Sequence, residues 1–128
     1  MDDFRLPALV TLGVLVLLFV LAALVGKARA KHKIHAPATT GSPVFERVYR
    51  SHINTVENAV MFLPAMWLFA AYVSPLWAGV LGAAWIVIRA WYAAGYQANA
   101  AKRGAPFGLS MLIVAILVLG TLWGIVKM

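Results

Sequence analysis

Residues 58–88 read NAVMFLPAMWLFAAYVSPLWAGVLGAAWIVI, a stretch without a charged residue between Glu57 and Arg89. A membrane-spanning helix needs about 20 mostly apolar residues, so this stretch is long enough for two helices if something breaks it. Ser74-Pro75 supplies the break, because the residue before a proline is pushed out of the helical conformation. We therefore predict two antiparallel spans joined by a tight turn at residues 72–77.

The rest of the chain has the same apolar character. Of its 128 residues, 63% are hydrophobic and 12% are charged, and the mean hydropathy is +0.87. Soluble domains are about half apolar and about a quarter charged, so a soluble enzyme is excluded. The charge-free stretches 6–26 and 104–126 add two spans, and Gly120-x-x-x-Gly124 in the last one predicts a small-residue packing face.

We therefore predict an all-α membrane protein, an antiparallel four-transmembrane-helix bundle that forms one integral membrane domain over residues 1–128. The helices are expected at about residues 5–30, 43–73, 76–99 and 104–126. The second helix begins with Ser42 as cap, Pro43 at the first helical position and Glu46 in the first turn. At about 46 Å it exceeds the roughly 30 Å hydrocarbon core, so its first turns should protrude into water or line a polar cavity.

The N-terminal span is expected to stay as an anchor. Its apolar stretch exceeds the 7–15 residues of a signal-peptide core, and the leading residues MDDFR carry two acids to one base. With four spans, the loops after the first and third helices lie on the same side of the membrane. By the positive-inside rule this basic side is cytoplasmic, so both termini lie on the non-cytoplasmic side. An active site among these basic residues would lie toward the cytoplasm.

The net charge of +7 comes from eleven Lys and Arg against four Asp and Glu. Eight of the eleven bases lie on the predicted cytoplasmic side: Lys27, Arg29, Lys31, Lys33, Arg47, Arg50, Lys102 and Arg103. Membrane orientation and anionic ligands explain such a surplus, so nucleic acid is not an expected partner. For Lys27, Lys31 and Lys33, orientation alone and ligand contact both remain open.

Two polar stripes occur on the second and third helices. Spacings of 3, 4 and 3 place Arg47, Arg50, Asn54 and Glu57 on one helix face. Spacings of 3 and 4 relate Arg89, Tyr92 and Tyr96, and Arg103 follows just beyond that helix. Arg89 lies about 15 Å inside the end of its helix, so it should face the bundle and have a partner. Glu57 is the natural candidate.

A buried ion pair between Glu57 and Arg89 that only fixes the helix register is one interpretation of these stripes. It leaves most of the arginines unneutralised and the asparagine and tyrosines unexplained. The surplus of positive charge and donors indicates an anionic ligand, and the planar guanidinium of arginine suits carboxylates. With no cysteine in the chain, a disulfide, a thiolate metal site and a cysteine nucleophile are excluded, so any thiol chemistry must bring its own sulfur.

Several spaced motifs resemble the MAPEG superfamily, the membrane-associated proteins in eicosanoid and glutathione metabolism. They are residues 46–57, ERVYRSHINTVE, with the preceding TGSPVF of residues 40–45, then RAWYAAGY at 89–96 and KRG at 102–104. The resemblance covers nearly the whole chain. It implies a homotrimer of four-helix bundles that binds glutathione in a bent shape at each subunit interface, with no tightly bound cofactor.

The resemblance also implies a membrane-bound glutathione transferase, with glutathione-dependent peroxidase activity as a further reaction. Glutathione is the co-substrate, and a hydrophobic electrophile or lipid hydroperoxide enters from the membrane lipids. In the carried-over site Arg103 faces the sulfur as the catalytic residue, and Arg29 comes from the neighbouring subunit. The other residues implied to line the glutathione pocket are Arg50, Asn54, Glu57, Arg89, Tyr92 and Tyr96.

The chain departs from related sequences at two positions of the signature. His52 stands where members carry glutamine or histidine, and Asn58 where several carry tyrosine. We count His52 among the glutathione-binding candidates, and a hydrogen bond at a helix interface is the competing interpretation. His32 and His35 are expected to be solvated in the loop, and without an acid cluster beside them no metal site is expected.

Two other classes of protein remain as alternatives. A small multidrug-type transporter also has four spans, but such proteins rely on an acid in the first helix, and residues 6–26 contain none. A non-catalytic member of the same superfamily that binds lipid or glutathione is the second. Conjugation of glutathione to an aryl halide would separate this alternative from the enzyme.

Overall fold

The computed structural model describes residues 3–128, and all regular elements in that range are helical. They are α1 (Arg5–His32), α2 (Pro43–Tyr72), α3 (Pro75–Ala98), the short 3-10 helix η1 (Ala100–Arg103) and α4 (Gly104–Val126). The four α-helices are long and apolar enough to span a membrane. The prediction of an all-α four-helix bundle is confirmed. Residues 1–2, part of the segment whose charges argued against a signal peptide, lie outside the described range.

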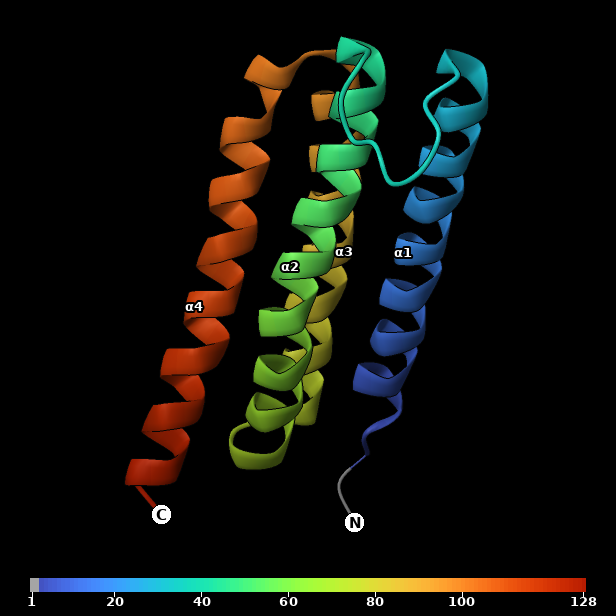
Figure 1. Cartoon of the computed structure of the whole chain (residues 1–128). Helices are drawn as coiled ribbons and strands as arrows, with labels where there is room; N and C mark the ends of the chain where they lie inside the picture. Colours follow the sequence, from blue (N-terminus) through green and yellow to red (C-terminus); the bar gives the residue numbers. More distant parts are fainter. Residues whose placement is uncertain (1–2) are drawn as a thin grey trace.

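The helices run antiparallel, with α1 and α4 on opposite flanks of the α2 and α3 pair (Figure 1). Both termini lie at one end of the bundle, while the α1–α2 loop and the connection from α3 through η1 to α4 lie at the other end. The two basic loops therefore lie at the same end, as the four-span arrangement requires. Which end faces the cytoplasm stays a prediction.

Serine caps followed by proline begin the two central helices. The side chain of Ser42 accepts a hydrogen bond from the Phe45 amide at 3.4 Å, and Ser74 accepts one from the Trp77 amide at 3.2 Å. Each cap satisfies an amide that has no partner within its helix, and the fixed φ of proline suits the first helical position. These two caps set where the chain turns at the two ends of α2.

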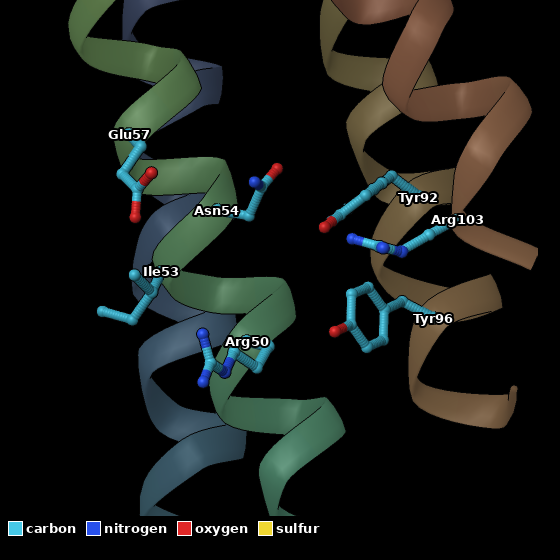
Figure 2. A pocket seen from close by; sticks show the side chains of 7 residues that line it. All are labelled: Arg50, Ile53, Asn54, Glu57, Tyr92, Tyr96 and Arg103. Carbon is cyan, nitrogen blue, oxygen red and sulfur yellow. The ribbon is translucent and has the colours of Figure 1, made fainter. Parts of the chain in front are cut away.

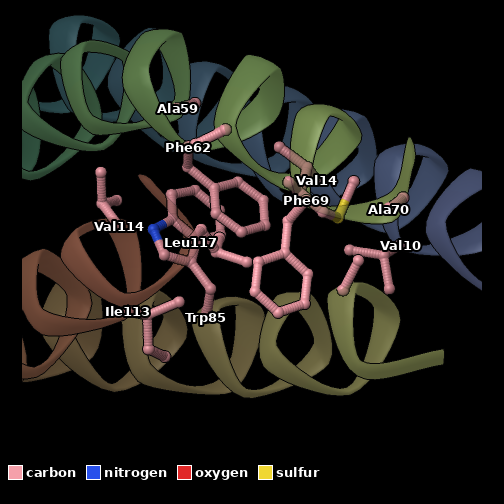
Figure 3. Packing of buried hydrophobic residues seen from close by; sticks show 13 residues of the cluster. Val10, Val14, Ala59, Phe62, Phe69, Ala70, Trp85, Ile113, Val114 and Leu117 are labelled. Carbon is pink, nitrogen blue, oxygen red and sulfur yellow. The ribbon is translucent and has the colours of Figure 1, made fainter. Parts of the chain in front are cut away.

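The core is aromatic where α2, α3 and α4 meet (Figure 3). The rings of Phe62 and Trp85 stack with centroids 4.3 Å apart and planes 3° from parallel. The indole nitrogen of Trp85 donates to Asn58 Oδ1 at 2.7 Å, and Asn58 Nδ2 lies 3.1 Å from Met111 Sδ. Asn58 is only 2% exposed, so in this chain it joins three helices in the core.

Helix α4 lies against the end of α2 along Gly120 and Gly124. A Cβ at Gly120 would lie 2.5 Å from the Phe69 ring, and one at Gly124 would lie 2.6 Å from the carbonyl oxygen of Tyr72. Real Cβ contacts are not this short, so both positions require glycine for the observed approach. The predicted small-residue packing face is therefore a contact surface within the chain.

Candidate functional site

Hydrogen bonds fix the first turns of α2 against the last turns of α3. Arg47 Nε donates to the carbonyl oxygen of Gln97 at 3.2 Å, and Gln97 Nε2 donates to Ser51 Oγ at 3.2 Å. Because these bonds join residues of the same turns that carry the two polar stripes, they hold the stripes beside each other. The start of α2 is thus held against the end of α3.

A cavity of about 230 Å³ lies between α2, α3 and η1. One wall consists of Arg50, Ile53, Asn54 and Glu57 from α2, and the other of Tyr92, Tyr96 and Arg103 (Figure 2). Six of these seven residues are sequence-predicted site residues. Ile53 is the seventh, and sequence reasoning missed it because an apolar side chain beside a polar stripe gives no signal.

Arg103 lies between the two tyrosines on the α3 side of the cavity (Figure 2). Its Cζ atom is 5.8 Å from the ring centroid of Tyr96, whose ring meets that of Tyr92 edge-on with centroids 5.7 Å apart. Arg103 ends η1 just before α4 begins, so this single 3-10 turn directs its guanidinium toward the cavity. The side chain is exposed and donates no hydrogen bond within residues 3–128, which leaves its donors free for a ligand.

Arg89 is fully buried behind the cavity wall instead of lining it. Its Nη2 donates to Asn54 Oδ1 and Thr55 Oγ1, both at 2.8 Å, and its Nη1 donates to Ser110 Oγ at 3.0 Å. Its Cζ lies 3.9 Å from the ring centroid of Tyr92. Arg89 therefore touches two lining residues, Asn54 and Tyr92, from behind and holds them in position.

The expected ion pair between Glu57 and Arg89 is wrong. The only ion pair in residues 3–128 joins Arg5 to Asp3, whereas Glu57 is exposed on the cavity wall. The buried Nε atom of Arg89 has no hydrogen-bond partner in residues 3–128, and neutral oxygens, not an acid, accept from its two terminal nitrogens. The hydroxyls that do so each donate their own proton to a helix carbonyl, Thr55 to Ser51 at 2.8 Å and Ser110 to Phe107 at 2.8 Å, so their lone pairs are available to Arg89.

Thr55 and Ser110 are the supporting residues that sequence reasoning missed. Thr55 follows Asn54 directly, and Ser110 is one of two hydroxyl residues, with Thr121, in a mostly apolar span. A polar side chain inside a predicted span was the available signal. In residues 104–126 only the glycine packing face was considered, and this signal was not used.

Besides Arg89, two predicted site residues do not line this cavity in their own chain. Arg29 Nη1 donates to the carbonyl oxygens of Ile34 at 3.3 Å and Ala38 at 2.7 Å, and its Cζ lies 5.0 Å from the Phe45 ring centroid. These contacts tie the α1–α2 loop to both helices. His52 is half-buried, and its ring forms no hydrogen bond within residues 3–128.

The charges on the cavity wall favour an anion that also carries one positive group. Arg50 and Arg103 are cationic and Glu57 is anionic, and the side chains of all three are without a hydrogen bond or ion pair in the described part of the chain. The positive charge of Arg89 lies behind the lining residues Asn54 and Tyr92. No group of three or more His, Asp or Glu that could hold a metal ion is found among residues 3–128.

Fold and site together define an integral membrane protein with four helices and a cationic pocket at the loop end of the bundle. The profile of the MAPEG family matches residues 7–123, and the chain belongs to that family.

Three relatives illustrate the match. The chain is 48% identical to an uncharacterized protein of Synechocystis sp. over 93% of this chain and 87% of the relative. It is 44% identical to microsomal glutathione S-transferase 2 of Homo sapiens, over 74% of this chain and 65% of the human protein. It is 35% identical to leukotriene C4 synthase of Cavia porcellus, over 94% and 83% of the two chains.

Proposed function

We propose that the protein is a membrane-bound glutathione transferase that activates the thiol of glutathione for attack on hydrophobic electrophiles from the bilayer. The observation that carries the proposal is the cavity that gathers Arg50, Asn54, Glu57, Tyr96 and Arg103 from three separate elements. The name of the human relative, microsomal glutathione S-transferase 2, supports the same ligand. The family match gives no support to the transporter alternative.

Glutathione fits the charges of this cavity. It carries two carboxylates and one ammonium, and the free guanidinium of Arg50 and the tyrosine hydroxyls suit the carboxylates. Glu57 is the anionic group on the wall that suits the ammonium. Asn54, whose oxygen is held by Arg89, points across the cavity toward Tyr92 (Figure 2), so its amide nitrogen is available as a donor.

Arg103 is proposed to favour the thiolate form of bound glutathione. A free thiol has a pKa of about 8.5, and lowering it to about 6.5 requires roughly 2.7 kcal/mol of differential stabilisation. A guanidinium beside the sulfur supplies this only where water is partly excluded, because the interaction weakens as the local dielectric constant rises. In the single chain Arg103 is exposed, so a neighbouring subunit is needed to cover it.

A homotrimer would supply that cover, with Arg29 contributed from the adjacent copy. We also keep His52 as a candidate glutathione-binding residue. Arg29 uses only its Nη1 atom to hold the loop, so Nε and Nη2 keep their donors for a ligand in a neighbouring site. We propose in addition that the loop end of the bundle faces the cytoplasm, since it carries eight of the eleven bases.

In the proposed reaction the thiol proton leaves to solvent and the sulfur lone pair forms a bond to the electrophilic carbon. With an aryl halide the carbon–halogen bond breaks and halide departs with its electron pair. With a hydroperoxide the thiolate attacks the terminal oxygen and the O–O bond breaks, giving a sulfenic acid and an alkoxide that takes a proton from solvent to become the alcohol. A second glutathione reduces the sulfenic acid to disulfide and water.

The test combines glutathione binding by calorimetry with turnover of an aryl halide by the purified protein. We expect Arg103→Ala to lower kcat at least 100-fold while the Kd for glutathione changes only a few fold. Arg103→Lys is the matched control that keeps the charge, and it should retain part of the activity. If wild type binds glutathione but turns over no electrophile, the protein is the non-catalytic binding member, and if it does not bind glutathione the proposal fails.

A further inference from the structure

A second concave region lies on the face formed by α1 and α3, and it shares no lining residue with the glutathione cavity. It consists of two adjoining hollows of about 220 and 270 Å³. Leu24 and Gln97 line both hollows, so the two form one continuous groove. The groove extends from the middle of the bundle to its loop end.

The α1 wall of the groove changes character along its length. Leu17, Val20, Leu21 and Leu24 line the inner part, and Lys27 and Lys31 line the outer part. Their spacings of 3, 1, 3, 3 and 4 residues keep all six on one face of the helix. The wall is therefore apolar at the membrane interior and cationic at the loop end.

The α3 wall is low because its side chains are short. Ala90, Ala93 and Ala94 line the inner hollow opposite the leucines of α1, so a channel remains between the two helices. At the outer end the floor is formed by Ala28 and by Val44 and Val48 of α2. No acidic residue lines either hollow.

The length of the groove corresponds to one leaflet of a bilayer. From Leu17 to Lys31 the helix rises about 21 Å, and half of a bilayer that is about 40–45 Å thick with its headgroups is about 20–22 Å. An apolar channel of this depth with a basic outer end complements a lipid that has an anionic headgroup. Lys27 and Lys31 are exposed and have no ion-pair partner within residues 3–128.

We propose that this groove binds one anionic phospholipid, with an acyl chain between α1 and α3 and the phosphate held by Lys27 and Lys31. His32 and the amide of Gln97 lie at the same outer end and offer further polar contacts. The bases after α1 then bind a lipid in addition to setting the membrane orientation. This inference is independent of the proposed glutathione chemistry, because the two sites have no lining residue in common.

The test is native mass spectrometry of the detergent-purified full chain titrated with phosphatidylglycerol or phosphatidylcholine. Each lysine should contribute about fivefold to phosphatidylglycerol affinity, so Lys27→Gln/Lys31→Gln should weaken it about 25-fold. Lys33→Gln is the matched control, since it removes the same charge from the same end of α1 outside the groove, and it should change the affinity less than twofold. Ala94→Phe fills the channel without changing any charge and should also abolish tight binding.

Four results would overturn the proposal. Equal affinity for the two lipids would show that the headgroup charge is not recognised. Unchanged lipid binding in Ala94→Phe would show that the acyl chain does not lie between α1 and α3. A change of oligomer mass in Ala94→Phe would show that a second copy of the protein occupies the groove. Inorganic phosphate in millimolar excess should not displace the lipid, and displacement would show that the site is one for free phosphate.

Discussion

Replacing Thr55 by valine should destabilise the protein more than replacing Arg89 by methionine, although the second change removes a charge. In Thr55→Val the buried guanidinium loses one of the two acceptors of its Nη2 atom, which leaves Asn54 alone at 2.8 Å. In Arg89→Met no charge remains to be satisfied. The Thr55 hydroxyl still donates to the Ser51 carbonyl oxygen, and Asn54 can turn toward the cavity.

The expected magnitudes follow from these contacts. A hydrogen bond to a charged group contributes about 1.5–3 kcal/mol, so Thr55→Val should raise the unfolding equilibrium constant about 10- to 100-fold. Removing a buried charge together with its desolvation penalty is often neutral when a side chain of similar volume replaces it. Arg89→Met should therefore change the free energy of unfolding by less than about 1.5 kcal/mol, a value within the range for volume-conserving replacements.

A double-mutant cycle in mixed micelles, followed by circular dichroism during unfolding with a denaturing detergent, measures the interaction directly. In the Arg89→Met background Thr55→Val should change stability little, which gives a coupling energy of about 1.5–3 kcal/mol. Thr121→Val is the matched control, because Thr121 is 5% exposed and donates to the Leu117 carbonyl oxygen at 2.7 Å without a cation nearby. If the two changes add within about 0.5 kcal/mol, the hydroxyl does not stabilise the guanidinium and the reasoning is wrong.

Three other predictions concern packing, the core and the cavity. Gly120→Ala should lower the free energy of unfolding by about 1–3 kcal/mol through overpacking. Gly108→Ala, whose Cβ meets nothing within 4 Å, should leave the free energy of unfolding equal or higher, and chemical unfolding of both variants is the check. Asn58→Leu should cost about 1–3 kcal/mol, because the buried indole N–H of Trp85 loses its acceptor, and should shift tryptophan fluorescence while the Kd for glutathione stays within twofold. Glu57→Gln should change the free energy of unfolding by less than about 0.5 kcal/mol, since surface changes outside special contacts have small effects. It should weaken glutathione binding about fivefold in calorimetry, and an unchanged Kd would show that Glu57 does not hold the ammonium group.

The helix ends were predictable from the sequence because charges and capped prolines mark them. Ser74-Pro75 ends one helix and begins the next, and the observed helices begin and end within two residues of the expected positions. Pro64 lies in the same apolar stretch, yet it is exposed inside α2 without ending it. The difference between the two prolines is the cap, because Ser74 accepts a hydrogen bond from an amide in the first turn of α3. An internal proline without such a cap is tolerated in a membrane helix when the freed carbonyl finds another partner.

The candidate site was predictable as a set of faces but not as a set of contacts. Helical spacing placed Arg50, Asn54 and Glu57 on one face, and the cavity has all three on its wall. The same spacing could not show that Arg89 lies behind the wall. One of its acceptors is Ser110 of α4, and helical spacing within α3 says nothing of which α4 residue lies opposite. Neutral oxygens on two other helices hold the terminal nitrogens of Arg89, so the nearest acid in the sequence is not its partner.

The 3-10 turn between α3 and α4 also lay outside sequence reasoning. Asn99 begins it by accepting a hydrogen bond from the Ala101 amide at 3.0 Å, and the turn ends at Arg103. Sequence spacing treated residues 100–103 as a linker. Its tight geometry is what brings the proposed catalytic arginine over the ring of Tyr96.

The proposal that Arg103 stabilises a glutathione thiolate is tested most directly by the ultraviolet difference spectrum of the protein on adding glutathione. At pH 7 a thiol with a pKa of about 6.5 is mostly ionised, whereas free glutathione with a pKa of about 8.5 is only a few per cent thiolate. We predict that wild type shows a thiolate absorbance that saturates at or somewhat below one thiolate per site. Arg103→Ala should lose this absorbance while it still binds glutathione in calorimetry. A full thiolate signal in Arg103→Ala, or bound glutathione without the signal in wild type, would contradict the assignment.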